Sequence, residues 1–374
     1  MIKIKEVNTK KEIKQFIKIQ KLFYKENPNF VHPIISEEMK NFDKGKNPLY
    51  KHADYQLFIA EKNGEIVGRI AAIENKRHNE IHNDSVGFFG FFESINDQNV
   101  ANELFDAAKK WLLSRGKTIM RGPTNPTFND VIGFSADAFD SPPVILSPYT
   151  NLYYLQLCEN YGMKKAKDLF AYKLENHNYR SEKLNRYHNL IQQKTNAVLR
   201  EVDLKNKNQL AKDVKILKEL YNLAWEKNWG FVKMTDEEFD FLAESLVQVG
   251  KKELTLIVEI NDKPVGFALV LPDINQALIH NKSGTLLGAG WCLLTKKKKI
   301  NTCRIIVLGV IPEYRNKGLE VLLYYRIGDA ALGLGIPTGD ASWILEDNEM
   351  MIRGLTQTMN ATRYKTFRIY EIDC

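Results

Sequence analysis

Residues 303–320 of this 374-residue chain join an apolar run to a basic turn that contains glycine. The run ends at Pro312, which has no main-chain N–H and cannot continue a strand ladder. The turn that follows consists of Arg315, Asn316, Lys317 and Gly318. A helix that starts here presents main-chain N–H groups without partners inside the helix, and such donors bind phosphate. The sequence therefore predicts an anion-binding turn between a strand over 304–310 and a helix over 318–334.

Glu320 complicates this interpretation, because it falls in the first turn of the predicted helix. A carboxylate at a helix N-terminus is favoured by the helix dipole but competes with a phosphate ligand. A plain alternative remains open, in which the segment is only a strand, a solvated basic loop and a helix.

The segment from Val310 to Glu320 resembles motif A of the GNAT superfamily of acyl-CoA N-acyltransferases, V-x-P-x-x-(R/Q)-x-x-G-x-(G/A), with Glu320 in place of the final Gly or Ala. The resemblance implies that the turn holds the pyrophosphate of coenzyme A and that Val310 pairs with the pantetheine. It also implies that the main-chain N–H of Leu308 polarises the thioester carbonyl, as a one-donor oxyanion hole. Acyl-CoA, with an acetyl or a longer chain, is then the expected cosubstrate. No metal is expected.

The resemblance also implies an Asn that contacts pantetheine, followed seven residues later by a Tyr that protonates the leaving thiolate. Asn348 fits the first position, but residue 355 is Leu. Tyr364, another tyrosine or water must then supply the proton, or the chemistry has been lost. Asn348 is equally compatible with an ordinary helix N-cap. An ammonium acceptor also needs a base. The candidate bases are Glu259, Asp273, Asp130 and His280.

Residues 121–154 form a long Pro- and Asn-rich stretch with interleaved aromatic residues, and long ordered loops are usually functional. The stretch resembles the G-P-x-N-P-[ST]-x-N-D segment of a bacterial tandem-GNAT family of about this length, which points to a relationship with bacterial ceramide synthases. We expect some of its side chains to line an acceptor pocket between the two halves of the chain. These residues are Asn125, Asn129, Asp130, Tyr149 and Tyr153, with Tyr154 beside them. Alternatively, the polar residues cap turns and the tyrosines seal an interface.

The elements that position these residues occur twice. Residues 59–68 and 257–266 align at an offset of 198, and each reads as a β-hairpin whose Asn-Gly or Asn-Asp turn accepts φ > 0. Each half then continues with a strand, an amphipathic helix and a second strand. In the first half these are 85–92, 97–115 and 118–121; in the second they are 304–310, 318–334 and 340–344, with a further helix after Asp347 and a closing strand over 365–372.

We therefore predict an α/β fold (an α+β mixed sheet) of two tandem GNAT-like domains, each a bent mixed sheet flanked by helices. Residues 1–175 form the N-terminal domain, whose cofactor motif is degenerate because 91–99 contains no glycine and no base. Residues 176–374 form the C-terminal domain, which carries the acyl-CoA motif.

Composition limits the partners. The chain is 44% apolar and 26% charged, without a run of 18 apolar residues or an apolar leader, which predicts a cytoplasmic globular protein. The net charge of +7 is too diffuse to choose among a polyanionic cofactor, an acidic surface and nucleic acid, and we expect no nucleic acid partner. Its densest point, 296–299, follows the apolar residues 290–294 and is either a solvated hairpin tip or a basic patch for peripheral membrane contact. The four cysteines have no metal spacing.

The leading hypothesis is an acyl-CoA-dependent N-acyltransferase that acylates a small-molecule or lipid-like amine bound between the domains. Two alternatives stay open. One is Fem-like transfer of an aminoacyl group from charged tRNA, and the other is a non-catalytic, ligand-binding tandem GNAT. The oligomeric state is left open by the sequence.

Overall fold

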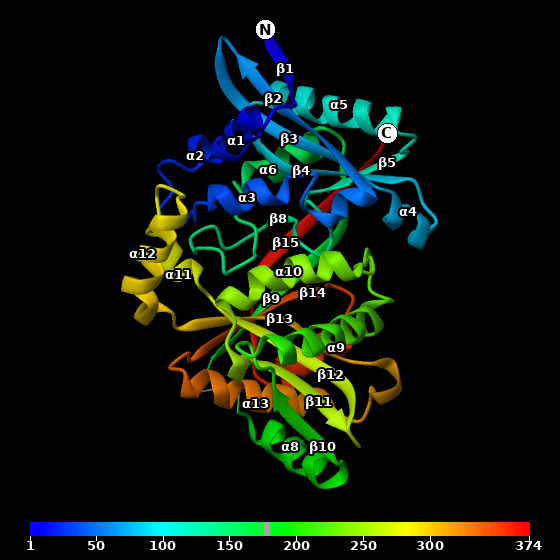
Figure 1. The fold of residues 1–374 in the computed structure, drawn as a ribbon. Helices are drawn as coiled ribbons and strands as arrows, with labels where there is room; N and C mark the ends of the chain where they lie inside the picture. Colours follow the sequence, from blue (N-terminus) through cyan, green and yellow to red (C-terminus); the bar gives the residue numbers. More distant parts are fainter. Residues whose placement is uncertain (176–179) are drawn as a thin grey trace. The chain divides into compact units, whose positions relative to one another are not determined.

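The computed structural model describes residues 1–175 and 180–374, which form two compact units (Figure 1). Unit 1 comprises Met1–Leu169, Ala277–Thr295 and Lys365–Cys374, and unit 2 comprises Phe170–Gln276 and Lys296–Tyr364. Unit 1 thus takes two segments from the second half of the chain. The domain boundary expected between residues 175 and 176 adjoins 176–179, which lie outside the described residues, and that boundary stays a prediction.

Unit 1 contains a mixed sheet with helices packed against it. Its strands follow the order β1 (Ile2–Val7), β2 (Ala53–Lys62), β3 (Glu65–Asn75), β4 (Val86–Ser94), β5 (Ile119–Gly122) and β15 (Thr362–Asp373). Its helices are α1 (Lys10–Lys18), α2 (Gln20–Phe23), α3 (Ile35–Asn41), α4 (Lys76–His82), α5 (Gln98–Ser114) and α6 (Tyr153–Asn160). Short strands β6 (Thr124–Asn125) and β7 (Val131–Ile132) pair with each other, β8 (Phe134–Ser135) pairs with β15, and β9 (Lys164–Glu175) runs from unit 1 into unit 2.

Helix α5 shows how the apolar pattern builds the core of unit 1. Asp97 caps its start by accepting a hydrogen bond from the Asn99 N–H at 3.0 Å. One face of the helix is fully buried, with Leu104, Ala108 and Leu112 packed in the core cluster of unit 1. The helix and the strands on either side of it lie where the sequence predicts them, within two residues.

Unit 2 repeats this plan. Its strands follow the order β14 (Thr338–Leu345), β13 (Thr302–Val310), β12 (Lys263–Pro272), β11 (Thr255–Ile260) and β10 (Ala197–Glu201). Its helices are α8 (Glu182–Lys194), α9 (Lys207–Trp225), α10 (Asp236–Val249), α13 (Leu319–Gly333) and α14 (Glu349–Arg353), the last continuing into a π-helical turn, Gly354–Thr358. The buried face of α13 packs on the sheet through Leu319, Leu322 and Leu323. The strands β13 and β14 and the helix α13 confirm the sequence prediction, whereas the closing strand β15 forms over the predicted residues but pairs with β5 of unit 1.

The two hairpins confirm the internal repeat in detail. Asn63 and Gly64 have φ of 55° and 86°, and Asn261 and Asp262 have φ of 50° and 62°, as the turn type requires. Each hairpin also has a register shift at the same aligned place, between Ala60 and Glu61 and between Val258 and Glu259. The predicted fold class, a mixed sheet flanked by helices and present in tandem, is therefore confirmed.

The tetralysine segment differs from the prediction of a hairpin tip. Residues 286–299 form α12 (Leu286–Lys296), which follows the short α11 (Asn275–Leu278), and a 3-10 turn, Lys297–Lys299. The hairpin prediction was wrong because the apolar run before the lysines has helical spacing, with Ala289 and Cys292 buried on one side. Among the residues that the structure describes, no helix has the length and apolar character needed to cross a membrane.

Candidate active site

The two parallel strands β13 and β14 separate in the middle of unit 2. They pair from Thr302 opposite Thr338 to Ile305 opposite Ala341, and then the register ends although both strands continue. A register shift against β12 falls at the same place, because Leu269 pairs with Val307 and Val270 with Ile305. The extra residue is a β-bulge, which bends β13 away from its parallel neighbour. Beyond the bulge β13 and β14 no longer pair with each other, and we call this unpaired stretch between the two strands the opening.

The main-chain N–H groups of Leu308 and Val310 point toward this opening. The N–H of Ile311 donates to the Val265 carbonyl of β12 at 2.9 Å, and successive residues of a strand alternate sides. Because no register shift interrupts β13 after Val307, the N–H groups of Leu308 and Val310 face away from β12. This is the orientation that the predicted oxyanion role of Leu308 requires. The role itself stays a prediction.

The turn after β13 has the shape of an anion cradle. A 3-10 turn at Pro312–Tyr314 leads into Asn316 and Gly318, whose φ values are 66° and 77°. Gly318 is the N-cap of α13, so the first N–H groups of the helix face out of the turn without partners inside the helix. A Cβ at residue 318 would lie 2.5 Å from Cδ1 of Ile191 in α8, so the Ile191 side chain would have to move, and the φ of 77° itself favours glycine.

The two cationic side chains of the turn have different surroundings. Arg315 donates from Nη2 to the Ala224 carbonyl at 2.6 Å and from Nε to the Val310 carbonyl at 3.3 Å. It thus joins the end of α9 to the end of β13 and shapes the cradle. Lys317 is exposed, and its ammonium lies 4.3 Å from the ring centroid of Tyr314. Lys317 is therefore the cation of this turn that is exposed for a phosphate.

Glu320 lies within the cradle, as its place in the sequence implies. Burial raises the pKa of Glu320, although its own main-chain N–H and the nearby Arg315 guanidinium act in the opposite direction. The carboxylate is thus held over the same helix N-terminus that a pyrophosphate would use.

The two predicted helper positions have structural roles. Asn348 Oδ1 accepts a hydrogen bond from the Met351 N–H at 3.2 Å, so its side chain caps α14. Leu355 is fully buried in an apolar cluster with Ala341 and Met359. A tyrosine hydroxyl does reach this helix from elsewhere, because Tyr324 of α13 donates to Met351 Sδ at 3.1 Å. Burial raises the pKa of Tyr324, so this phenol stays protonated. The sequence did not indicate this contact, because Tyr324 lies within an apolar helical segment.

A buried polar network joins β13 and β14 just where they separate. Arg304 is 3% exposed and donates from Nε to Ser342 Oγ at 3.0 Å. Its Nε also lies 3.6 Å from Oδ1 of the buried Asp340, and Ser342 Oγ donates to the same carboxylate. The Tyr364 hydroxyl donates to Asp340 Oδ2 at 2.5 Å. Desolvation and the Asp340 charge raise the pKa of Tyr364, which therefore stays protonated at neutral pH. The network fixes the base of the opening.

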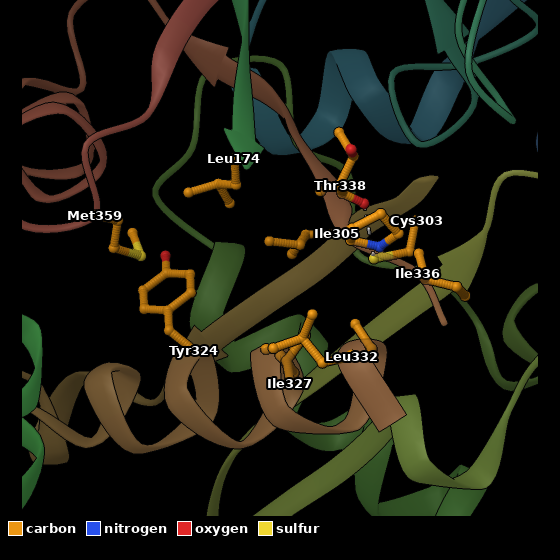
Figure 2. A pocket seen from close by; sticks show the side chains of 13 residues that line it. Leu174, Cys303, Ile305, Tyr324, Ile327, Leu332, Ile336, Thr338 and Met359 are labelled. Carbon is orange, nitrogen blue, oxygen red and sulfur yellow. Dashed lines mark hydrogen bonds between the residues drawn. The ribbon is translucent and has the colours of Figure 1, made fainter. Parts of the chain in front are cut away.

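The opposite face of these strands lines a small apolar cavity, which Figure 2 shows. Its volume is about 50 Å³, well below the roughly 300–1,000 Å³ of a pocket for a drug-sized ligand. Cys303 and Ile305 of β13 face Tyr324, Ile327 and Leu332 of α13 across it, with Met359 beside Tyr324 (Figure 2). Side chains alternate along a strand, so Arg304 and its network lie on the other face.

The structure does not bring Glu259 to Leu308. Glu259 lies on β11, which β12 separates from β13, and two strand spacings amount to about 10 Å. Its Oε1 accepts a hydrogen bond from Arg200 Nε at 2.7 Å. Arg200 also contacts the buried Asp213 at 2.9 Å. This ion pair joins Glu259 of β11 to Arg200 of the neighbouring strand β10, and the role of Glu259 as a base stays a prediction.

The polar candidates of unit 1 serve as turn and strand contacts. Asn125 Oδ1 accepts the Phe91 N–H at 2.6 Å. Asp130 Oδ2 accepts both the N–H and the hydroxyl of Thr127, at 3.1 and 2.6 Å. The Asn129 N–H donates to Thr127 Oγ1 at 3.1 Å. These contacts match the alternative in which the polar residues cap turns.

The tyrosine candidates are also engaged within unit 1. The Tyr149 hydroxyl donates to the Phe139 carbonyl at 2.8 Å and accepts from Asn27 at 3.0 Å. The Tyr153 hydroxyl donates to the Ser94 carbonyl at 2.7 Å, and burial raises its pKa to about 12. An acceptor-binding role for this set stays a prediction.

Unit 1 contains the counterpart of the opening in unit 2, but its own chain fills it. Parallel pairing of β4 with β5 ends at Phe88, and the register of β4 against β3 shifts just beyond. At this place the Phe91 N–H donates a hydrogen bond to the Asn125 side chain. The Thr124 carbonyl oxygen is so close to Gly90 that a Cβ on residue 90 would lie 1.7 Å from it. Residues 124 and 125 thus lie against β4 where its pairing with β5 has ended. The described residues also contain no group of three or more His, Cys, Asp or Glu that could hold a metal ion.

Comparison with known proteins gives relatives of the same fold. No family model matches the sequence. The tandem GNAT protein from the clavulanic acid biosynthesis pathway has a similar fold, with a TM-score of 0.56 at 10% identity over 100% of this chain and 98% of that one. A GCN5-related N-acetyltransferase from Sphaerobacter thermophilus gives a TM-score of 0.54 at 11% identity over 100% and 95%.

Two curated proteins are related over nearly their whole length. Protein YghO of Escherichia coli (strain K12) is 31% identical over 371 residues, covering 97% of this chain and 93% of the relative. The bacterial ceramide synthase of Caulobacter vibrioides (strain NA1000 / CB15N) is 33% identical over 379 residues, covering 98% and 96%. The chain is therefore an acyltransferase with a tandem GNAT fold, and it belongs to the same family as the bacterial ceramide synthase of Caulobacter vibrioides.

Proposed function

We propose that the protein transfers an acyl group from acyl-CoA to the amine of a long-chain amino alcohol and forms a ceramide-like amide. The observation that carries the proposal is the opening between β13 and β14, with two strand N–H groups facing it and a helix N-terminus at its end. The name of the Caulobacter relative supports a long-chain amine as acceptor.

The chemistry needs few side chains. The neutral amine attacks the thioester carbonyl, and the Leu308 N–H stabilises the resulting oxyanion. Collapse of the tetrahedral intermediate breaks the C–S bond, and the coenzyme A thiolate takes up the proton that the amine releases. The exposed ammonium of Lys317 and the first N–H groups of α13 hold the pyrophosphate.

Product formation tests this proposal directly. Purified protein is incubated with palmitoyl-CoA or acetyl-CoA and a long-chain amino alcohol, and the amide is measured by mass spectrometry while thiol release is followed with a chromogenic disulfide. We expect equal amounts of amide and free thiol. Titration calorimetry with each acyl-CoA in the absence of amine measures binding. Absence of amide with every acyl-CoA, or aminoacyl transfer from charged tRNA in the same assay, would contradict the proposal.

Glu320→Gln is expected to strengthen acyl-CoA binding roughly fivefold near neutral pH, because it removes a like charge from the pyrophosphate site. The raised pKa of Glu320 sets the sign of the pH effect. Lowering the pH protonates the wild-type carboxylate, so the difference between the proteins should shrink from about pH 8 to about pH 5.

The same shift predicts a stability effect. A carboxyl whose pKa is raised in the folded state loses its contribution to stability as the pH rises through that pKa, so Glu320→Gln should raise the Tm at neutral pH. Glu313→Gln is the matched control, since Glu313 lies in the same turn but its side chain is 71% exposed and pairs with Lys263. Equal effects of the two substitutions would show that Glu320 does not face the ligand.

A further inference from the structure

Helix α12 turns an apolar face outward. Four large side chains on it are exposed: Leu286 by 59%, Leu287 by 89%, Trp291 by 70% and Leu294 by 74%. They recur at the helical period, so with Gly290 they form one continuous stripe, which we call the α12 stripe. Isolated exposed leucines are ordinary, but a contiguous apolar face of this kind marks an interaction site.

The opposite face of α12 is anchored in unit 1. Ala289 and Cys292 are buried. The loop before the helix is tied down by the Ile35 N–H, which donates to the Gly284 carbonyl at 3.0 Å, and by Lys21, whose ammonium donates to the Ser283 carbonyl at 2.7 Å. The stripe is therefore presented by a fixed element (α12 is yellow in Figure 1).

The charges around the stripe are all positive in the local sequence. Lys282 precedes α12, and Lys296 to Lys299 end it and form the following turn. No Asp or Glu occurs between Asp273 and Glu313. Desolvation and the neighbouring Lys18 lower the pKa of Lys21, and the charges of Lys21 and Lys282 add to burial in lowering the pKa of His32. The chain segment that contains α12 thus carries only positive formal charges.

We propose that α12 docks this protein onto an anionic lipid bilayer, lying in the interface plane with the α12 stripe among the acyl chains and the lysines at the headgroups. Leucine and tryptophan on one face with lysines beside them are the composition of an interfacial helix, and tryptophan favours the headgroup level. A protein partner would have to match both the apolar face and five positive charges, whereas an anionic membrane supplies both features without a specific shape. The inference goes beyond the proposed function and does not depend on acyl transfer.

Vesicle flotation of the full chain tests the docking without any substrate. We expect the protein to float with phosphatidylcholine vesicles that contain phosphatidylglycerol and to remain in solution with pure phosphatidylcholine. Binding should weaken as salt is added, because the headgroup charges are screened. Trp291 emission should shift to the blue on binding, and Trp291→Phe should remove most of that shift.

Two variants separate the apolar and electrostatic contributions. Leu287→Ser with Trp291→Ser and Leu294→Ser changes only exposed side chains, and it should lower vesicle partitioning at least roughly tenfold. Replacing Lys296, Lys297, Lys298 and Lys299 by Gln should have an effect of at least roughly this size. The charge-matched control replaces the exposed Lys205, Lys207, Lys212 and Lys215 by Gln, and the apolar control is Val198→Ser, which is 59% exposed in the wild type. Both controls should bind like wild type.

Several outcomes would overturn the proposal. One is equal binding to neutral and anionic vesicles; another is normal flotation of the triple serine variant. A third is a dimer in sedimentation velocity that the triple serine variant dissociates while vesicle binding is absent, since the stripe would then contact a second copy of the chain. Loss of vesicle binding in the variants with amide formation retained in detergent would support docking and leave the proposed function intact.

Discussion

Replacing Arg304 by Met is expected to lower the free energy of unfolding of unit 2 by about 3–5 kcal/mol, the usual cost of leaving a buried carboxylate without its charged partner. Asp340 is 1% exposed and depends on Arg304 for a compensating positive charge. Urea unfolding measures the loss. Because the network joins β13 and β14 at the base of the opening, we also expect the amide hydrogens of these two strands to exchange faster in the variant.

Two further proteins test the cause of this loss. Arg304→Met combined with Asp340→Leu removes both charges, and it should recover much of the lost stability. Arg326→Met is the control, because Arg326 pairs with Glu201 at 2.9 Å but its side chain is 42% exposed; it should cost about 1 kcal/mol or less. A double variant as unstable as the sum of its single variants would contradict the assignment.

Gly318→Ala is expected to weaken acyl-CoA binding at least roughly tenfold, because the added Cβ displaces the first N–H groups of the cradle. The new methyl group would meet Ile191 at 2.5 Å, and the φ of 77° is unfavourable for alanine. Titration calorimetry with palmitoyl-CoA measures the effect on binding.

Gly335→Ala separates backbone strain from the cradle. Gly335 follows α13 with a φ of 75°, but a Cβ there has no atom within 4 Å. Both substitutions should cost about 1–2 kcal/mol of stability through the left-handed conformation, and only Gly318→Ala should also lose acyl-CoA affinity. Unchanged affinity in Gly318→Ala would show that this turn does not bind the cofactor.

The sequence alone predicts the structure correctly where local chemistry determines it. The Asn-Gly and Asn-Asp turns, the Pro312 strand end and the period of α5 each act over a few residues, and each led to the correct element. The cradle at Gly318 is of the same kind, because a positive φ before a helix is a local property.

The sequence was insufficient where a side chain finds its partner far along the chain. The sequence predicts that Arg315 binds phosphate, but its guanidinium donates a hydrogen bond to the carbonyl of Ala224, 91 residues away. The sequence predicts that Asn125 contacts the substrate, whereas in the structure its Oδ1 accepts a hydrogen bond from the Phe91 N–H. The hydroxyl of Tyr324 and the burial of Leu355 likewise depend on how α13 and α14 pack. Such contacts follow from tertiary packing and leave no local pattern.

Unit 1 is built from both ends of the chain, and this has a consequence for its folding during protein synthesis. Strand β15 pairs Tyr370 with Gly122 and Ile372 with Met120, and Tyr370 is buried in the core of the unit. Arg368 forms two hydrogen bonds with Asp168, at 2.8 and 3.0 Å. Chains emerge from the ribosome N-terminus first, and most N-terminal domains fold while the rest is being translated. Here the unit that is started first must wait for residues 365–374, so it holds an open sheet edge during almost the whole of translation.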